Sequence, residues 1–238
     1  MTGARRFRDD PYLKSCTARV VAVSARGIEP DRTVFAPRGG GQPGDTGRLH
    51  RADGVAVRIV DARPGEEPES VVHVPAPDAP ALAVGDLVTA ELDGDRRYAH
   101  RRLHTALHVR SGGVVAPVTG GHIAADQGRL DFAIDPSVLD AAHIERALNA
   151  LLECEVRTAT VWITDAELDA RPERVKTMSV QPPRGAGRVR LLRIPGIDID
   201  LQPCGGTHVR HRAAIGRVKV LRLRSEGKRN PRVEIGFG

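Results

Sequence analysis

Hydrophobic and polar positions follow one pattern up to about residue 95 and a different pattern after it. In the first part, short apolar runs at 19–23, 55–60 and 87–90 are separated by Gly, Pro and Asp. Short apolar runs bounded by turn-forming residues are typical of β-strands. We therefore predict that residues 1–95 form a small N-terminal β-barrel domain.

The second pattern alternates helical and strand-like segments. A helix is predicted for 96–108, and a second one begins at Asp135 and Pro136, where Asp can cap a helix and Pro suits its first turn. Its apolar positions share one face. Strand-like segments follow, so residues 96–238 are predicted to form an α+β domain with an antiparallel sheet packed against helices. The apolar helix positions are Ile144, Leu148, Leu151 and Leu152, and the strands are 156–163, 189–194, 197–201, 218–223 and 233–237.

The composition is that of a protein with its own core, since 40% of the 238 residues are hydrophobic. No apolar run approaches the roughly 18 residues that span a bilayer, and the first residues do not resemble a signal peptide. The three cysteines, Cys16, Cys154 and Cys204, are few and widely spaced. We therefore expect a cytoplasmic protein with reduced thiols.

The formal charge of +6 favours a polyanionic partner, and the 3% aromatic content argues against a platform for stacked bases. A structured RNA fits both observations. The basic residues near the C-terminal end are either contacts for RNA phosphates or a solvated sheet face. They are Lys219, Arg222, Arg224, Lys228, Arg229 and Arg232.

Two short motifs far apart in the chain carry metal-binding residue types. His104 and His108 lie four positions apart, so on a helix they project from one face about 6 Å apart along its axis. Much later, Cys204 and His208 flank two glycines, which allow the backbone to pass close to an ion. Three imidazoles and a thiolate suit tetrahedral Zn²⁺ and not the oxygen-seeking Mg²⁺ or Ca²⁺.

The chain resembles the alanyl-tRNA editing proteins, free-standing relatives of the editing domain of alanyl-tRNA synthetase, over nearly its whole length. The principal matching stretches are 104–108, 204–209 and the glycine-rich 39–47, and supporting ones are 119–121, 129–132, 175–178 and 200–204. The glycine-rich stretch together with both metal motifs is similar to the medium-length form of the family, which has a β-barrel before the catalytic domain.

This resemblance implies that His104, His108, Cys204 and His208 bind zinc, and that the chain hydrolyses the ester of serine, or of glycine, on mischarged tRNA(Ala). It implies that Gln42 and Asp45 border the pocket for the tRNA end, although the glycine-rich stretch also suits a plain β-turn. His122 stands where the family usually has glutamine, and His100 and His211 are further imidazoles close to the motifs. Thr105, beside the first ligand, is our candidate for a contact to the serine hydroxyl, in which case Thr105→Val relaxes discrimination between serine and alanine esters.

Two other functions fit the same residues. One is hydrolysis of another small ester or amide at the metal, and the other is a zinc-stapled RNA-binding module without catalysis. Four protein ligands normally denote a structural zinc, whereas a catalytic zinc keeps a position for water or substrate. A catalytic ion would therefore gain a fifth contact or orient the amino acid.

Overall fold

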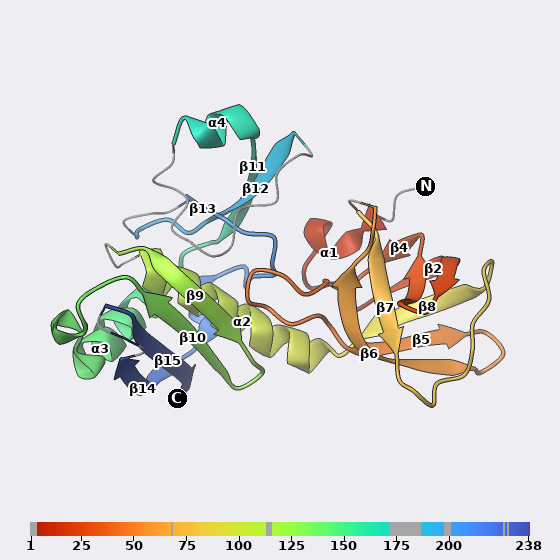
Figure 1. The fold of residues 1–238 in the computed structure, drawn as a ribbon, viewed down its shortest axis with the longest axis horizontal. Helices are drawn as coiled ribbons and strands as arrows, with labels where there is room; N and C mark the ends of the chain where they lie inside the picture. The colour runs from red at the N-terminus through yellow and green to blue at the C-terminus, as the bar shows by residue number, and fades with distance from the viewer. Residues whose placement is uncertain are drawn as a thin grey trace. The chain divides into compact units, whose positions relative to one another are not determined.

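The computed structural model describes residues 4–67, 69–112, 116–171, 187–197, 201–225, 227 and 229–238. By its internal contacts the chain divides into two compact units, Met1–Tyr98 and Ala99–Gly238. Among the described residues, no helix combines the length and apolar character needed to cross a bilayer. The two units are drawn in Figure 1 and are described separately below.

The first unit is a closed barrel with strand order β2-β3-β7-β6-β5-β8. Alternation along the strands explains its core: in β8, Val88, Ala90 and Leu92 are buried while the residues between them are exposed. Phe35 and Leu49 are fully buried in the same core. The strands are β2 (Ser15–Ser24), β3 (Gly27–Pro30), β5 (Gly47–Arg51), β6 (Ala56–Pro64), β7 (Val71–Pro75) and β8 (Leu87–Leu92), and a short parallel pair, β1 (Ala4–Arg5) and β4 (Arg32–Thr33), flanks α1 (Arg6–Asp9).

The glycine-rich stretch is a tight turn in this unit. The backbones of Gly39 and Gln42 exchange two hydrogen bonds of 3.0 Å, and the intervening Gly40 and Gly41 both have positive φ. A two-residue turn of this kind strongly favours glycine at both central positions. The chain continues from this turn into β5.

The second unit contains a four-stranded antiparallel sheet, a three-stranded antiparallel sheet and the helices packed with them. The first sheet has the order β14-β15-β10-β9 and the second the order β11-β12-β13. The strands are β9 (Val118–Ile123), β10 (Gln127–Phe132), β11 (Ala159–Thr164), β12 (Arg188–Arg193), β13 (Leu201–Pro203), β14 (Val218–Ser225) and β15 (Pro231–Phe237). The helices are α2 (Gly94–Gly112), which begins in the first unit, α3 (Ala141–Leu152) and α4 (Asp165–Asp169), with short 3₁₀ turns at Pro136–Val138 and Arg212–Ile215. The barrel followed by α+β structure with antiparallel sheets confirms the predicted fold class.

The helix predicted to start at Pro136 starts instead at Ala141. Asp135 does accept a hydrogen bond from the Ser137 amide, but only a 3₁₀ turn follows. The true cap is Asp140, whose carboxylate accepts from the amides of Ala142 and His143. Asp135 and Asp140 both satisfy the local capping rule. The buried apolar face of the helix, which includes Ile144 and Leu148, begins only after Asp140.

Two helices hold the four-stranded sheet in place. Side-chain atoms of Asn149 in α3 bond both the amide and the carbonyl of Val218, at 3.0 and 2.8 Å, at the start of β14. The central helix α2 packs against β10, where Leu107 lies directly over Gly128. From Leu103 to Val109 every side chain of α2 except that of His108 is buried. This helix therefore has little freedom to shift.

Candidate metal centre

His104 and His108 project from one face of α2, one turn apart. Their rings stack with centroids 5.1 Å apart, and His104 is buried whereas His108 is half-buried. The helical spacing therefore places two imidazoles side by side, with the more accessible one toward the C-terminal end of α2.

The loop after β13 brings in the other pair. The Cys204 amide donates to the carbonyl of Arg190 at 3.0 Å, which continues the ladder between β12 and β13 by one residue. The chain then turns away at Gly205 and Gly206, and the Gly206 amide points back at the Cys204 sulfur, 3.4 Å distant. His208 follows and is buried.

Arg190 fixes the path of this loop. Its Nη1 atom donates to the carbonyls of Cys204 at 2.8 Å and Gly206 at 2.9 Å, and its Nη2 donates to Thr160 Oγ1 at 3.1 Å. One guanidinium therefore ties both ends of the glycine turn to β11 and β12. The fork shape of arginine suits such bridging.

The structure brings His104, His108, Cys204 and His208 together, with one potential ligand atom from each lying within 4.8 Å of all the others. The Cys204 sulfur is 3.4 Å from His104 Nε2 and 3.2 Å from His208 Nε2. Ligands at Zn–S of about 2.3 Å and Zn–N of about 2.05 Å in a tetrahedron are separated by roughly 3.5 Å. The donor set and its spacing therefore fit a zinc-like divalent ion.

The pKa shifts of Cys204 and His208 also suit a metal. Burial alone would raise the pKa of the Cys204 thiol, but the surrounding imidazoles of His104, His208 and His108 hold it well below its usual value. Burial lowers the pKa of His208 to about 3. A thiolate and a neutral imidazole are the forms that bind metal ions.

Two polar side chains fix ring orientations from outside the cluster. Gln202 Oε1, which can only accept, lies 2.9 Å from His108 Nδ1, so this nitrogen carries the proton and Nε2 is left for the centre. Thr105 Oγ1 lies 3.3 Å from His208 Nδ1, donates to the Arg101 carbonyl at 2.8 Å and accepts from the Val209 amide at 3.2 Å. A hydroxyl has one proton and two acceptor positions, so these three contacts use all of them.

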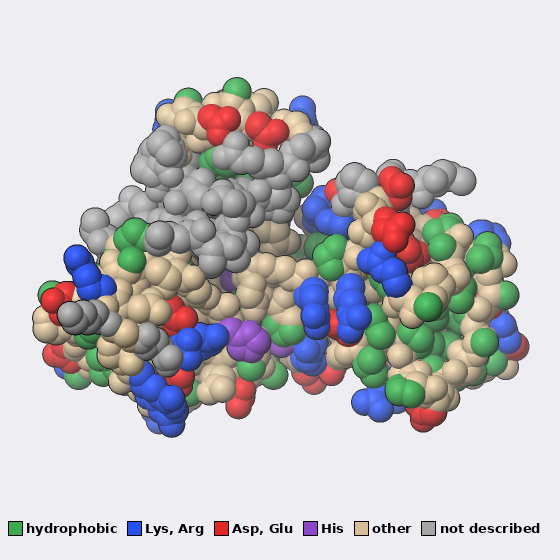
Figure 2. Space-filling view, in the orientation of Figure 1, with side chains coloured by type: hydrophobic (Ala, Val, Ile, Leu, Met, Phe, Trp, Pro, Cys, Tyr) green, Lys and Arg blue, Asp and Glu red, His purple; other side chains and the backbone are tan. Residues whose placement is uncertain are grey.

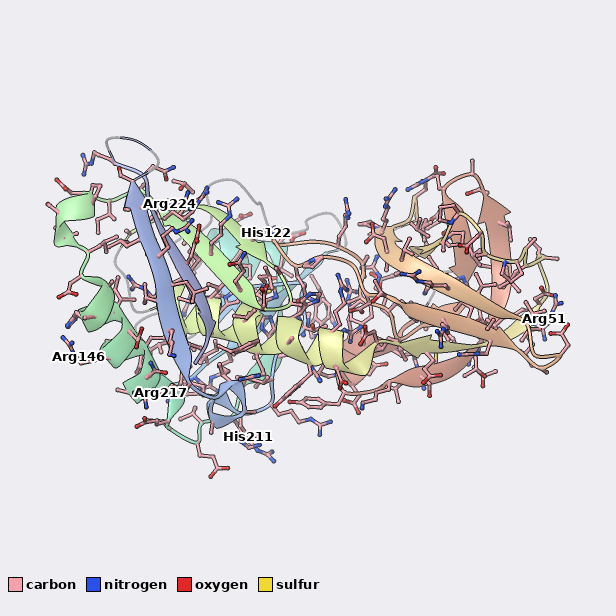
Figure 3. All side chains as sticks on the ribbon, turned by 90° about the horizontal axis from the view of Figure 1, so that it is seen from below. Arg51, His122, Arg146, His211, Arg217 and Arg224 are labelled. Carbon is pink, nitrogen blue, oxygen red and sulfur yellow. The ribbon has the colours of Figure 1, made fainter. Side chains whose placement is uncertain are left out.

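The remaining candidate residues lie elsewhere. His122 is exposed on β9 and His211 precedes the 3₁₀ turn Arg212–Ile215 (Figure 3), and neither belongs to the cluster, nor does the buried His100. In the first unit, Gln42 and Asp45 are both buried. The Asp45 carboxylate pairs with Arg97 and accepts from the Ala36 amide at 2.6 Å, so its hydrogen-bonding capacity serves the barrel. A role for these residues at the tRNA end stays a prediction.

Four of the basic residues near the C-terminal end are exposed, and a fifth is paired within the protein. Lys219, Arg222, Arg224 and Arg229 are exposed, and blue side chains gather on this part of the second unit at the lower left of Figure 2. Arg232 instead pairs with Asp131, at 2.8 Å between Nε and Oδ1. Lys228 lies outside the described residues, as do 175–178 in the supporting motifs.

Neither Gln202 nor Arg190 was among the residues predicted to form the site. The sequence contained a signal that Gln202 lies beside the metal-binding residues. It precedes Cys204 by two positions, and residues two apart share a strand face. The sequence contained no such signal for Arg190, because this residue reaches the glycine turn only through the pairing of β12 with β13.

Comparison with known proteins gives consistent matches. A family model described as the threonyl and alanyl tRNA synthetase second additional domain matches residues 189–234. The alanyl-tRNA editing protein AlaX-M of Methanosarcina mazei is 34% identical over 98% of this chain and 95% of its own length. The AlaX-M protein of Saccharolobus solfataricus is 32% identical over 95% of each chain. The alanine–tRNA ligase of Pyrococcus furiosus is 32% identical over 91% of this chain but only 24% of its own length.

Proposed function

This chain belongs to the alanyl-tRNA editing protein family, and from that premise we propose that it acts in trans on tRNA(Ala) and hydrolyses the ester of a wrongly attached amino acid. It is an aminoacyl-tRNA deacylase. The observation that carries the proposal is the four-residue cluster at His104, His108, Cys204 and His208, within a chain that aligns with an AlaX-M protein over 98% of its length.

We propose Zn²⁺ as the ion, with these four side chains as its ligands. The soft thiolate and three imidazoles favour it over Mg²⁺ and Ca²⁺. A bound ion would supply Lewis acidity or a fixed point that orients the aminoacyl group. His108 is the half-buried member of the cluster, so we propose that the aminoacyl group approaches on its side.

The protein's own residues set the geometry of this centre. Arg190 holds the glycine turn, Gln202 holds the ring of His108, and Thr105 holds the ring of His208. Such outer partners keep ligands in place before substrate arrives, which lowers the cost of reaching the reactive arrangement.

Serine is the proposed amino acid, with glycine second. Discrimination against alanine requires groups that pair with the serine hydroxyl and are left unpaired when alanine enters. Because the Thr105 hydroxyl already has three protein partners, a direct contact to serine would displace one of them. We therefore favour an effect of Thr105 through His208.

The test is deacylation of Ser-tRNA(Ala), Gly-tRNA(Ala) and Ala-tRNA(Ala), with and without a chelator. We expect hydrolysis of the serine ester, slow hydrolysis of the alanine ester, and loss of activity on metal removal that added zinc restores. Cys204→Ser should abolish turnover, whereas Cys154→Ser, which changes an exposed thiol of the same unit, should not. Turnover of small free esters without tRNA would indicate another hydrolase, and tRNA binding without turnover would indicate an RNA-binding module.

A further inference from the structure

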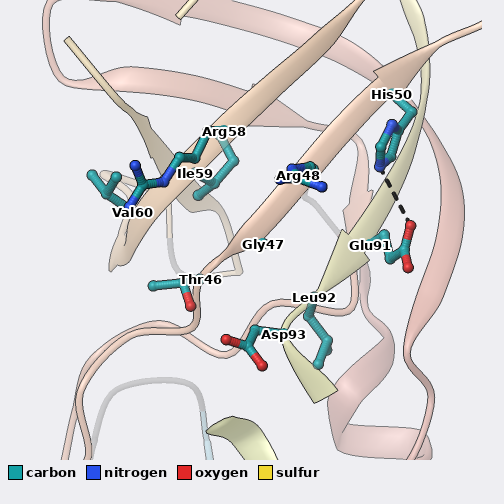
Figure 4. A pocket seen from close by; sticks show the side chains of 10 residues that line it. All are labelled: Thr46, Gly47, Arg48, His50, Arg58, Ile59, Val60, Glu91, Leu92 and Asp93. Atoms are coloured by element: carbon teal, nitrogen blue, oxygen red, sulfur yellow. Dashed lines mark ion pairs between the residues drawn. The ribbon is translucent and has the colours of Figure 1, made fainter. Parts of the chain in front are cut away.

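A pocket of about 480 Å³ lies on the outer surface of the barrel, where β6, β5 and β8 run side by side. Figure 4 shows its lining, with the side chains of Arg48 and Arg58 rising from neighbouring strands. The pocket lining contains no Phe, Tyr or Trp. Its lining residues are Thr46, Gly47, Arg48, His50, Arg58, Ile59, Val60, Glu91, Leu92 and Asp93.

Arg48 and Arg58 are directly opposite each other across the β5–β6 ladder. Like charges at such positions repel and destabilise a sheet. No ion pair or hydrogen bond joins either side chain to another residue in the part of the chain that the structure describes. Both side chains are exposed and free to move toward a ligand.

Other arginines on the same strands are paired. Arg51 on β5 lies 2.7 Å from Asp53 and 3.1 Å from Asp86. Arg63 on β6 lies 2.9 Å from Asp61. The barrel therefore neutralises its arginines on these strands except at this pocket.

The two carboxylates of the pocket already have protein partners. Glu91, the neighbour of Arg48 on β8, lies 3.3 Å from His50 Nε2, a contact marked in Figure 4 that is an ion pair when the ring is protonated. Asp93 accepts a hydrogen bond from the Arg96 amide at 3.1 Å, at the start of α2. Both carboxylates therefore already have a contact within the protein, whereas neither guanidinium group does.

From this arrangement we infer that the Arg48–Arg58 pocket binds backbone phosphate of the tRNA substrate. The inference rests on the proposed function, since it takes tRNA as the partner. Guanidinium groups present paired donors that match phosphate oxygens, and adjacent strands lie about 4.8 Å apart, so both can reach one phosphate or two successive ones. A phosphate between them also removes their mutual repulsion. Contacts of this kind position an RNA without reading its sequence.

The test compares two double variants that remove the same amount of charge. Arg48→Ala/Arg58→Ala should weaken binding of uncharged tRNA(Ala) about tenfold and flatten the dependence of log Kd on log salt concentration by about one to two units. Arg51→Ala/Arg63→Ala, which alters paired arginines of the same strands, should leave both quantities near the wild-type values. Arg48→Lys/Arg58→Lys, which keeps both positive charges, should retain most of the wild-type binding.

Thermal melting is the check that the variants are folded. Arg48→Ala/Arg58→Ala should melt close to wild type, because neither guanidinium group has an ion pair or hydrogen bond to lose. Equal losses of binding in the two double variants would show an effect of overall charge, and unchanged binding in Arg48→Ala/Arg58→Ala would show that the pocket does not contact tRNA. Either result overturns the inference. Because binding is measured on uncharged tRNA, it is independent of whether the wild-type protein deacylates serine esters.

Discussion

Gln202 accepts a hydrogen bond from the ring of His108, with 2.9 Å between Oε1 and Nδ1. The same amide is itself fixed, because Oε1 also accepts from Ser111 at 2.9 Å and Nε2 donates to the His108 carbonyl at 3.2 Å. Gln202 is buried, so water does not replace these contacts. One residue of β13 thus sets both the rotation and the tautomer of a proposed ligand on α2.

Replacing this amide should weaken metal binding more than folding. Gln202→Leu removes the acceptor for His108 Nδ1–H, and loss of such an outer partner typically lowers metal affinity about 10- to 100-fold. Competition with a chromophoric chelator measures the affinity, and the visible spectrum of the Co²⁺-substituted protein reports the ligand geometry. Gln202→Glu, which keeps an acceptor oxygen, should retain most of the affinity. Equal zinc affinity in Gln202→Leu and wild type would refute the positioning role.

Thr105→Val should lower turnover of serine and alanine esters together. The substitution keeps the shape of the side chain but leaves the buried Val209 amide and His208 Nδ1–H without their acceptor, at a cost of about 1–3 kcal/mol each. Thr105→Ser keeps the hydroxyl and should behave nearly as wild type. Parallel kcat/KM measurements on both esters decide the matter, because a hydroxyl that contacts serine directly would change the ratio of the two rates.

Asp45 and Arg97 form a buried ion pair in the first unit, with each side chain 1% exposed. Asp45→Ala leaves the guanidinium buried without its partner and should destabilise the barrel by about 3–5 kcal/mol. The exposed pair of Asp53 and Arg51 is the control, since Asp53→Ala should cost no more than about 1 kcal/mol. Urea unfolding measures both. An Asp45→Ala protein of wild-type stability but impaired turnover would instead support the predicted place of Asp45 at the tRNA end.

His73 in the barrel core should make stability depend on pH. Burial lowers its pKa from 6.5 to about 4, and the neutral ring is held by Thr33 at 2.8 Å and the Val71 carbonyl at 3.1 Å. Below pH 6.5 the unfolded chain binds a proton that the folded barrel does not, so stability falls by about 1.4 kcal/mol per pH unit until about pH 4, roughly 3 kcal/mol in total. Urea unfolding at pH 7, 6 and 5 measures the slope. His73→Gln should reduce it by this contribution, and an unaltered slope would assign the pH dependence to other groups.

The sequence predicted the elements whose signals are local. The short apolar run at 87–90 is enough to indicate a strand, and the four-residue spacing of His104 and His108 is enough to place two rings on one helix face. Which distant segment meets that helix depended on the resemblance, because no local rule relates residue 104 to residue 204.

Other features depend on tertiary contacts. Asp135 and Asp140 both fit the capping rule, and only the packing of Ile144 and Leu148 selects the second. The hydroxyl of Thr105 looked available for substrate in the sequence, but the fold brings Val209 and His208 against it. The pairing of Asp45 with Arg97 was equally hidden, because the two positions are 52 residues apart.

The distance along the chain between the two halves of the metal centre has a consequence for assembly. His104 and Cys204 are separated by 100 positions, so an ion bound by both closes a very long loop of chain. Closing such a loop reduces the conformational entropy of the unfolded chain, and the ion acts as a removable cross-link within the second unit. Removal of a bound ion would therefore lower the stability of the second unit and raise the population of open forms that proteases can cut.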